Sequence, residues 1–334
     1  MRAAVWTSEG NLEVVDRPNP EPKPGWVRVK VDRVGICGSD LHFWTGAFPS
    51  PAGLLPGHEV GGTIDAIGEP VDGAAPLAVG TPVCVEPLVG CGWCGYCGVG
   101  QFNRCAKRQI FGISGRGGMA ELMTVPANRV YRLPDGVAAA DGVLVEPVAV
   151  CVRGVRLGGV GLGTRVAVLG AGSIGLVSIL AAHAAGASEV GFTARHPAQR
   201  ELALAFGATP IDDGAISSYD VVIETVGGHA GTLDQAIGLT RPGGTIAVLG
   251  VFDGMVPINA FEMGQKELRI VNSNCYGRAD DAHTDFDIGL SLFRSQHDAL
   301  RSLVTHRFPL DRVNDAFATA ADKSTGSVKV VIEP

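Results

Sequence analysis

The stretch RVAVLGAGSIGLVSILAAHAAGA, residues 165–187, restricts the fold of this chain more than any other segment. An apolar run typical of a buried parallel strand leads into three glycines, and an alanine-rich run typical of a helix follows. Between a strand and a helix, this G-x-G-x-x-G pattern predicts a dinucleotide-binding turn. Gly170 permits the turn, Gly172 lets the backbone approach a pyrophosphate, and Gly175 allows the helix to pack closely.

The residues that follow bear on the choice of dinucleotide. A diphosphate is expected at the N-terminus of the helix, over Ser173 and Ile174, because free N–H groups favour anions there. About 20 residues further on, a carboxylate normally binds the ribose hydroxyls of NAD, but residues 191–199 include no acid. Arg195 stands there instead, and its guanidinium suits a 2′-phosphate. Nearby Arg200 either assists it or is an exposed helix residue. We therefore predict NADP as the cofactor, with use of both NADP and NAD as the alternative.

Strand and helix patterns continue to alternate beyond this turn, as in EVGFTA followed by AQRELALAFGA. Such alternation predicts an α/β fold with a doubly wound parallel sheet. The chain has 334 residues, more than one compact core usually takes, so we expect two domains. Hydrophobic residues make up 46% of the chain, which indicates a large buried core.

Charge and hydropathy argue against nucleic-acid and membrane partners. The net charge is −7 with acidic and basic residues interspersed, so the chain lacks the basic stripe that a phosphate backbone demands. No apolar run approaches the ~20 residues that span a membrane. The stretch MRAAVWTSEGNLEVV has no apolar core of a secretory signal. We therefore expect a cytoplasmic protein, in which clustered cysteines more often bind metal than form disulfides.

The stretch CGWCGYCGVGQFNRC contains half of the 8 cysteines. Their C-x-x-C-x-x-C-x7-C spacing, with glycines between them, suits a closed tetrahedral zinc site formed by Cys91, Cys94, Cys97 and Cys105. Four protein sulfurs leave no position for a substrate, so we expect a structural zinc. The alternatives are a secreted disulfide framework and a zinc ribbon that binds nucleic acid. The latter needs a basic surface and widely separated cysteine pairs.

Upstream, GICGSDLHFW and PGHEVGGTI carry three potential zinc ligands of mixed type, Cys37, His58 and Glu59. Taken singly, they also suit a buried thiol, a loop histidine and a surface glutamate. Together with the four-cysteine stretch, EPVAV and GAGSIG, however, they follow the order found in one family. In these motifs the chain resembles the zinc-dependent medium-chain dehydrogenases, the group that includes alcohol, sorbitol and threonine dehydrogenases. The resemblance extends over almost the full length.

The resemblance implies roles for particular residues. Cys37, His58 and Glu59 match the ligands of a catalytic zinc, and Glu146 matches a further acidic ligand of polyol-type members, direct or bridged by water. Ser39 and His42 match a proton relay to solvent, and Asp40 matches a carboxylate that orients the zinc histidine. The chain would thus bind one catalytic and one structural zinc ion.

The resemblance also implies an architecture and a reaction. A GroES-like β-barrel catalytic domain, residues 1–145 and 285–334, would carry both zinc sites, and residues 146–284 would form the Rossmann domain, with the active site in the cleft between them. The reaction would transfer a hydride between a secondary alcohol and the nicotinamide, with zinc as a Lewis acid. A homodimer or homotetramer is implied, and ELRIVNSNCY could supply an edge strand for a dimer.

The resemblance also limits the class of compounds from which the substrate comes. Glu146 favours polyol and threonine-like substrates over simple alcohols, which leaves a sugar alcohol, cyclitol, amino-alcohol or vicinal diol, together with the corresponding ketone. Sorbitol-type members carry an arginine–tyrosine pair where this chain has Cys275–Tyr276, which speaks against sorbitol itself. The aromatic residues Phe43, Trp44 and Phe48 line either the substrate pocket or the core.

The sequence leaves two alternative functions to consider, and it also predicts the burial of four further residues. Zinc-free relatives reduce activated double bonds but lack the catalytic ligands that this chain retains, and a non-catalytic nucleotide sensor would keep the fold alone. Of the remaining residues, Cys84, Cys151 and Cys275 are expected to be small buried side chains, and His183 a packed or half-exposed one.

Overall fold

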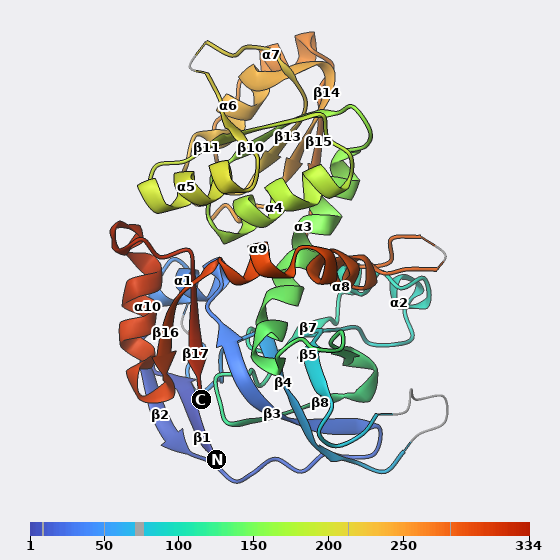
Figure 1. The fold of residues 1–334 in the computed structure, drawn as a ribbon, viewed down its shortest axis with the longest axis vertical. Coiled ribbons are helices and arrows are strands. Elements are labelled where there is room, and N and C mark those ends of the chain that lie inside the picture. Colours follow the sequence, from blue (N-terminus) through green and yellow to red (C-terminus); the bar gives the residue numbers. More distant parts are fainter. Residues whose placement is uncertain (9, 50, 71–76, 213, 281) are drawn as a thin grey trace. The chain divides into compact units, whose positions relative to one another are not determined.

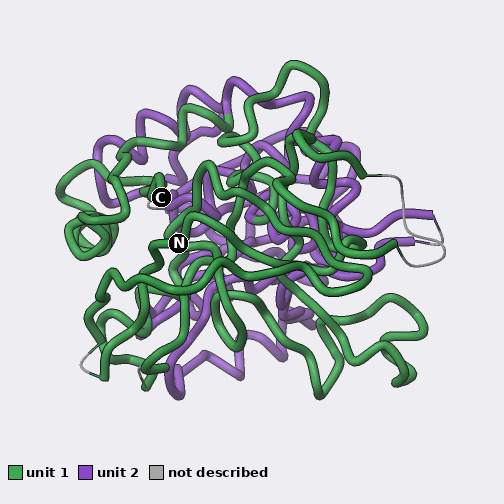
Figure 2. Tube along the Cα trace, turned by 90° about the horizontal axis from the view of Figure 1, so that it is seen from below, with its two compact units in different colours: residues 1–146, 300–334 green, residues 147–299 purple. Residues whose placement is uncertain are grey.

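The computed structural model describes residues 1–8, 10–49, 51–70, 77–212, 214–280 and 282–334, which form two compact units. The first unit comprises residues 1–146 and 300–334, and the second comprises residues 147–299 (Figure 2). The sequence-based division assigned residues 285–299 to the first domain, whereas here they belong to the second. The reason lies at Asp285, whose buried carboxylate accepts hydrogen bonds from Arg153 and Arg156 at 2.9 Å each.

The first unit is built on an extended sheet in which the described strands lie in the order β16-β17-β3-β4-β5-β9, with β8 also paired to β3. The sequence of β3, WVRVKVDRVG, alternates so that Val27, Val29 and Val31 are buried and the residues between them are not, as expected for an antiparallel strand with one face in the core. The strands of this sheet are β3 (Trp26–Gly35), β4 (Glu59–Ile67), β5 (Pro82–Val85), β8 (Leu122–Pro126), β9 (Val130–Arg132), β16 (Val304–Pro309) and β17 (Lys329–Glu333).

At one edge of this sheet, β16 and β17 come from the far end of the sequence; β16 pairs with β17, and β17 pairs with β3. This pairing shows why the strand-like SVKVVIEP returns to the first unit. The other elements of the unit are β1 (Arg2–Trp6), β2 (Leu12–Asp16), α1 (Gly38–Trp44), β6 (Leu88–Val89), α2 (Gly95–Gly98), η1 (Phe102–Arg104), β7 (Gln109–Ile110), η2 (Ala127–Arg129), η3 (Ala139–Leu144), η4 (Leu310–Arg312), α10 (Val313–Ala321) and η5 (Lys323–Thr325).

The second unit contains the parallel sheet that the glycine motif predicted. Its described strands lie in the order β12-β11-β10-β13-β14-β15, and all pairings are parallel. The strand β10, RVAVL, is buried from its second residue on, because helices cover both faces of such a sheet. Figure 1 shows α4 and α5 along one face and α6 on the other.

The strands of the second unit are β10 (Arg165–Leu169), β11 (Glu189–Thr193), β12 (Thr209–Pro210), β13 (Tyr219–Glu224), β14 (Thr240–Val248) and β15 (Arg269–Asn272). Its helices are α3 (Val145–Gly158), which begins where the first unit ends, α4 (Ser173–Ala184), α5 (Pro197–Ala205), α6 (Thr232–Leu239), α7 (Ala260–Gln265), α8 (Asp285–Ser295) and α9 (His297–Arg301).

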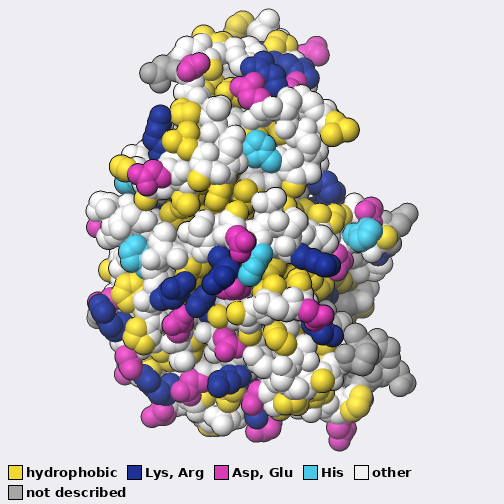
Figure 3. Space-filling model, in the orientation of Figure 1, with side chains coloured by type: hydrophobic (Ala, Val, Ile, Leu, Met, Phe, Trp, Pro, Cys, Tyr) yellow, Lys and Arg dark blue, Asp and Glu magenta, His cyan; other side chains and the backbone are white. Residues whose placement is uncertain are grey.

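The surface carries mixed charge. Acidic and basic side chains are interspersed on the face shown in Figure 3. Within the part of the chain that the structure describes, no helix is long and apolar enough to cross a bilayer.

Candidate metal centres and dinucleotide site

The four cysteines of the stretch 91–105 converge in the first unit. Their sulfur atoms all lie within 4.8 Å of one another, and Cys91 Sγ is 3.9 Å from Cys97 Sγ. The backbone N–H of Cys91 donates to Cys105 Sγ at 3.4 Å. All four are free thiols, so they do not form disulfides with one another. Four sulfurs at this spacing fit a tetrahedral zinc ion and leave no vertex for a substrate.

Local backbone geometry brings these sulfurs together. Gly92 has a φ of +87°, a left-handed turn that other residues rarely adopt. At Gly90, a Cβ atom would lie 2.5 Å from Cys97 Sγ, so only glycine leaves room for that sulfur. Hydrogen bonds from the N–H groups of Trp93 and Cys94 lower the pKa of the Cys91 thiol to about 6, which favours the thiolate form that binds a metal.

A second potential metal site lies where α1 and β4 begin. One ligand atom each from Cys37, His58 and Glu59 lies within 4.8 Å of the other two. Cys37 is the residue before α1, and its N–H donates to Asp40 Oδ2 at 2.9 Å, which fixes the first turn of that helix. His58 and Glu59 adjoin at the start of β4, and both are buried. Mixed sulfur, nitrogen and oxygen donors suit a zinc site that keeps a position open.

Asp40 lies behind the imidazole of His58. Asp40 is fully buried, and its Oδ1 is 3.7 Å from His58 Nδ1, with neither atom hydrogen-bonded in the described structure. Burial opposes protonation of His58, but the nearby groups Asp40, Cys37 and Glu146 together outweigh it and raise the pKa of the imidazole. A carboxylate on the Nδ1 side leaves Nε2 as the nitrogen for a metal, the arrangement common at zinc sites. The residues therefore fit the ion.

Sequence reasoning missed Lys329, which is 1% exposed. Its Nζ lies 2.7 Å from both carboxylate oxygens of Glu59, which is itself 0% exposed. The proximity of Glu59 and Cys37 outweighs the effect of burial and raises the pKa of Lys329. The only signal in the sequence is a lysine inside the apolar run SVKVVIEP, where a buried charge requires a partner.

Glu146 stands apart from this group. It is buried in the first turn of α3 and belongs to the first unit, but it is not among the three residues whose ligand atoms lie within 4.8 Å of one another. Its charge nevertheless raises the pKa of both His58 and Lys329, so it acts on the site electrostatically. Such a placement is compatible with a water-bridged role.

The predicted relay residues lie on α1. Ser39 Oγ is 3.5 Å from His58 Nε2, which places the hydroxyl beside the nitrogen that faces a metal. The ring of His42 stacks on Phe48, with ring centroids 4.8 Å apart and an interplanar angle of 26°. Phe43 and Trp44, in contrast, pack against the core of the first unit, where Trp44 contacts Phe317.

The glycine turn of the second unit has the predicted form. Gly170 follows β10 with a φ of +92°, and a Cβ atom on Gly175 would collide with the carbonyl oxygen of Gly170. A Cβ atom on Gly172 meets nothing within 4 Å, so the space over this residue is open, as a diphosphate requires. Ser173 and Ile174 form the first turn of α4.

Two threonines at neighbouring strand ends fix this turn. The N–H of Gly170 donates to Thr193 Oγ1 at 3.0 Å, and Thr225 Oγ1 donates to the carbonyl oxygen of Leu169 at 2.8 Å. Arg195 and Arg200 follow β11, and both are exposed. Within the described ranges, neither guanidinium forms an ion pair, so both are available for an anion.

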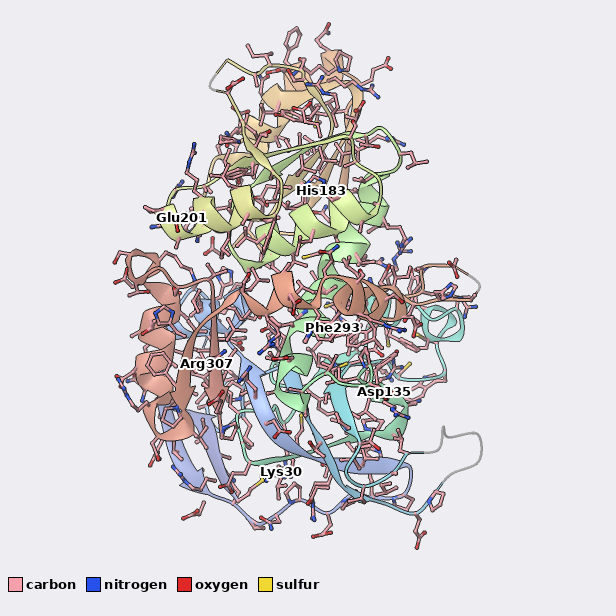
Figure 4. The ribbon with its side chains drawn as sticks, in the orientation of Figure 1. Lys30, Asp135, His183, Glu201, Phe293 and Arg307 are labelled. Atoms are coloured by element: carbon pink, nitrogen blue, oxygen red, sulfur yellow. The ribbon has the colours of Figure 1, made fainter. Side chains whose placement is uncertain are left out.

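The remaining predictions for single residues differ in outcome. Cys84 and Cys151 are buried as expected, and Cys151 Sγ donates to the carbonyl oxygen of Ile174 at 3.3 Å. His183 is partly buried on α4 (Figure 4). The prediction for Cys275 is wrong, because this residue is partly exposed in a left-handed turn after β15, with a φ of +54°.

Comparisons with known proteins identify the family of both parts of the chain. Residues 23–135 match the alcohol dehydrogenase GroES-like domain, and residues 173–288 match the zinc-binding dehydrogenase domain. Sorbitol dehydrogenase of Gallus gallus is 31% identical over 99% of this chain and 96% of its own length. The 2-dehydro-3-deoxy-L-galactonate 5-dehydrogenase of Pseudoalteromonas atlantica is 30% identical, with 100% of this chain and 98% of that protein covered.

Solved structures extend the likeness to three dimensions. A zinc-binding dehydrogenase from Sinorhizobium meliloti bound to NADP has a TM-score of 0.87 and 32% identity, and the match covers 100% of this chain and 99% of that one. Galactitol-1-phosphate dehydrogenase from Escherichia coli has a TM-score of 0.88 and 27% identity, with 100% of both chains covered. This chain belongs to the zinc-dependent medium-chain dehydrogenases, with the predicted GroES-like and Rossmann folds.

Proposed function

We propose that this enzyme transfers a hydride between a secondary alcohol of the polyol class and a nicotinamide dinucleotide, with NADP preferred. The observation that carries the proposal is the Cys37–His58–Glu59 group, three mixed ligands brought within 4.8 Å in a unit that also contains a separate four-cysteine group. A protein that used zinc only to stabilise its fold would need only the four-cysteine group. The relatives named above include dehydrogenases of sorbitol and of galactitol-1-phosphate, which supports a polyhydroxylated substrate.

The chain's own residues have distinct tasks in this reaction. Cys37 and His58 would hold a zinc ion, with Glu59 facing the same point, and Asp40 would keep Nε2 of His58 turned toward it. A zinc ion bound there supplies Lewis-acid stabilisation of negative charge on the substrate oxygen. Ser39, beside His58, would accept the hydroxyl proton of the substrate while its own hydroxyl proton passes on toward His42 and solvent.

The second unit would hold the dinucleotide. The open space over Gly172 and the first N–H groups of α4 suit the diphosphate, and exposed Arg195 and Arg200 suit a 2′-phosphate. The cofactor itself supplies the hydride chemistry, and the protein supplies position. We assign the first unit as the catalytic domain and the second as the cofactor domain, in a cytoplasmic enzyme whose thiols stay reduced.

The test is an absorbance assay for reduced nicotinamide with zinc-loaded protein. Sorbitol, galactitol, inositol, a vicinal diol, threonine and a simple secondary alcohol are each offered with NADP⁺ and with NAD⁺. We expect turnover of at least one polyhydroxylated compound, abolished by Cys37→Ser and retained by Cys84→Ser, which changes a buried cysteine outside both groups. Normal turnover by the Cys37→Ser enzyme would contradict the proposal.

We also propose that two copies associate through the second unit. The strand β15 is the last strand of the parallel sheet, with a free edge among the described residues. Apolar side chains are exposed after β14 and in the first turn of α7, with Met255 at 100% and Phe261 at 78% exposure. A free edge beside exposed apolar groups needs protection from water. Light scattering should give a dimer or tetramer that Phe261→Asp weakens, and a monomer at high concentration would contradict this proposal.

A further inference from the structure

Three neighbouring strands of the first unit place a lysine against a predicted metal ligand. The strand β17 pairs with β3 at Val331 opposite Gly35, and β3 pairs with β4 at Gly35 opposite Glu59. Lys329 therefore reaches from β17 across β3 to a carboxylate on β4. Its Nζ also lies 3.4 Å from the carbonyl oxygen of Ile36, on the same path.

Gly35 makes this crossing possible. A Cβ atom at this position would overlap Glu59 Oε2, so the carboxylate occupies the space that a side chain on β3 would fill. With Glu59 and Lys329 both buried, water cannot take the place of either partner. The position of the carboxylate is thus determined by one ammonium group on one side and by the Cys37–His58 site on the other.

The ammonium group and a metal ion compete for the same charge. Nζ is equidistant from both oxygens of Glu59, at 2.7 Å, so it takes up one lone pair on each. A divalent cation next to Cys37 and His58 would meet a carboxylate that is already neutralised, and it would also meet the positive charge of Lys329. Both effects weaken zinc binding.

We infer that Lys329 is a positioning residue that holds Glu59 back from the zinc ion at Cys37 and His58 and thereby lowers the zinc affinity of this site. The inference rests on the proposed function only in assuming that this site binds zinc. A weakened third ligand leaves the ion free to accept a substrate oxygen. Without Lys329, the metal becomes the sole partner of a buried carboxylate, so it binds more tightly and the open position closes.

The measurement is the zinc dissociation constant of the Cys37 site, from competition with a chelator of known affinity. Lys329→Met removes the charge of the side chain, and Lys329→Arg preserves it. Each of these variants is measured alone and together with Glu59→Gln. We expect Lys329→Met to bind zinc about tenfold more tightly than the wild type, as for a typical coupling between two bound groups. Lys329→Arg should bind as the wild type does, and Lys329→Met should have no effect in the Glu59→Gln background.

If Lys329 only joins β17 to β4, the Lys329→Met variant will be less stable, but its zinc affinity will not increase. That result overturns the inference. An unchanged or weaker affinity does the same, as does a tightening that persists with Glu59→Gln. If Lys329→Met does not fold, Lys329→Gln replaces it, since glutamine keeps a donor and removes the charge.

Cys37→Ser separates this inference from the proposed function. That variant keeps the four-cysteine group, so it identifies which zinc release belongs to the Cys37 site. If Cys37→Ser still binds two zinc ions, the proposed site fails. If it loses one while Lys329→Met behaves as the wild type, only the inference about Lys329 fails.

Discussion

Replacing Gly35 by alanine should impair the metal site without changing any ligand. The backbone of Gly35 does not have a positive φ, so alanine is conformationally acceptable there, and the effect comes from the added Cβ atom alone. That atom would overlap Glu59 Oε2, so the carboxylate or the backbone must shift. A small shift that keeps the contact with Lys329 costs about 1–3 kcal/mol, as in an overpacked core. A larger shift that breaks the buried pair costs about 3–5 kcal/mol.

The protein adopts the less unfavourable response, so we expect Gly35→Ala to lower the free energy of unfolding by about 1–3 kcal/mol. For a unit of this size, each kcal/mol corresponds to a fall in Tm of about 2–4 °C. This smaller response still displaces the carboxylate of Glu59, and turnover should fall about 100-fold, because a displacement of about 1 Å at a reacting centre has that effect.

The assay combines a thermal melt, zinc analysis and hydride-transfer rates on the zinc-loaded enzyme. Gly38→Ala is the matched control, because a Cβ atom at Gly38 meets nothing within 4 Å although the residue is next to Cys37. We expect this control to match the wild type. If Gly35→Ala also melts, binds zinc and turns over like the wild type, the steric reasoning about Glu59 is wrong.

Three further outcomes are expected. Cys94→Ser should lose one zinc ion per chain but keep the one at Cys37; zinc analysis after gel filtration measures this, and retention of two ions would contradict the structural assignment. Arg195→Ala should lower kcat/KM for NADP at least about tenfold more than for NAD, because it removes one phosphate partner; an equal loss with both cofactors would refute the assignment of Arg195. Burial and the charge of Lys329 lower the pKa of Lys323 to about 8 from 10.5 in the unfolded chain. Between these pH values the unfolded state binds more protons, so the free energy of unfolding should rise with pH, and Lys323→Met should abolish that part of the rise in denaturation experiments.

The parts of this protein that the sequence predicts well are those formed by short segments. The glycine turn after β10 needs only a strand, three glycines and a helix in succession, and all lie within residues 165–187. The four-cysteine group is equally local. The geometry of such a motif depends only on residues close together in the sequence, because backbone sterics and ligand spacing act within a few residues.

The pairing of Lys329 with Glu59 could not be predicted in this way. These residues lie 270 positions apart, and their contact depends on the order of β17, β3 and β4 in the sheet. Nor did the sequence reveal that α8 stays with the second unit, since that placement follows from the contact of Asp285 with Arg153, 132 positions away. Non-local pairs of this kind are set by topology.

The return of β17 to the first unit has a consequence for how the protein is made. Chains emerge from the ribosome from the N-terminus onward, and β17 follows the entire second unit in the sequence. Cys37, His58 and Glu59 are therefore synthesised long before the lysine that neutralises Glu59. If the first unit begins to fold during that interval, its thiol, imidazole and carboxylate meet without Lys329, and by the inference above they would bind zinc more tightly than the finished protein does. Zinc binding would thus be most favourable during synthesis. The pairing of β17 with β3 would then bring Lys329 to Glu59, lower the zinc affinity of the site and leave a position on the ion open for the substrate.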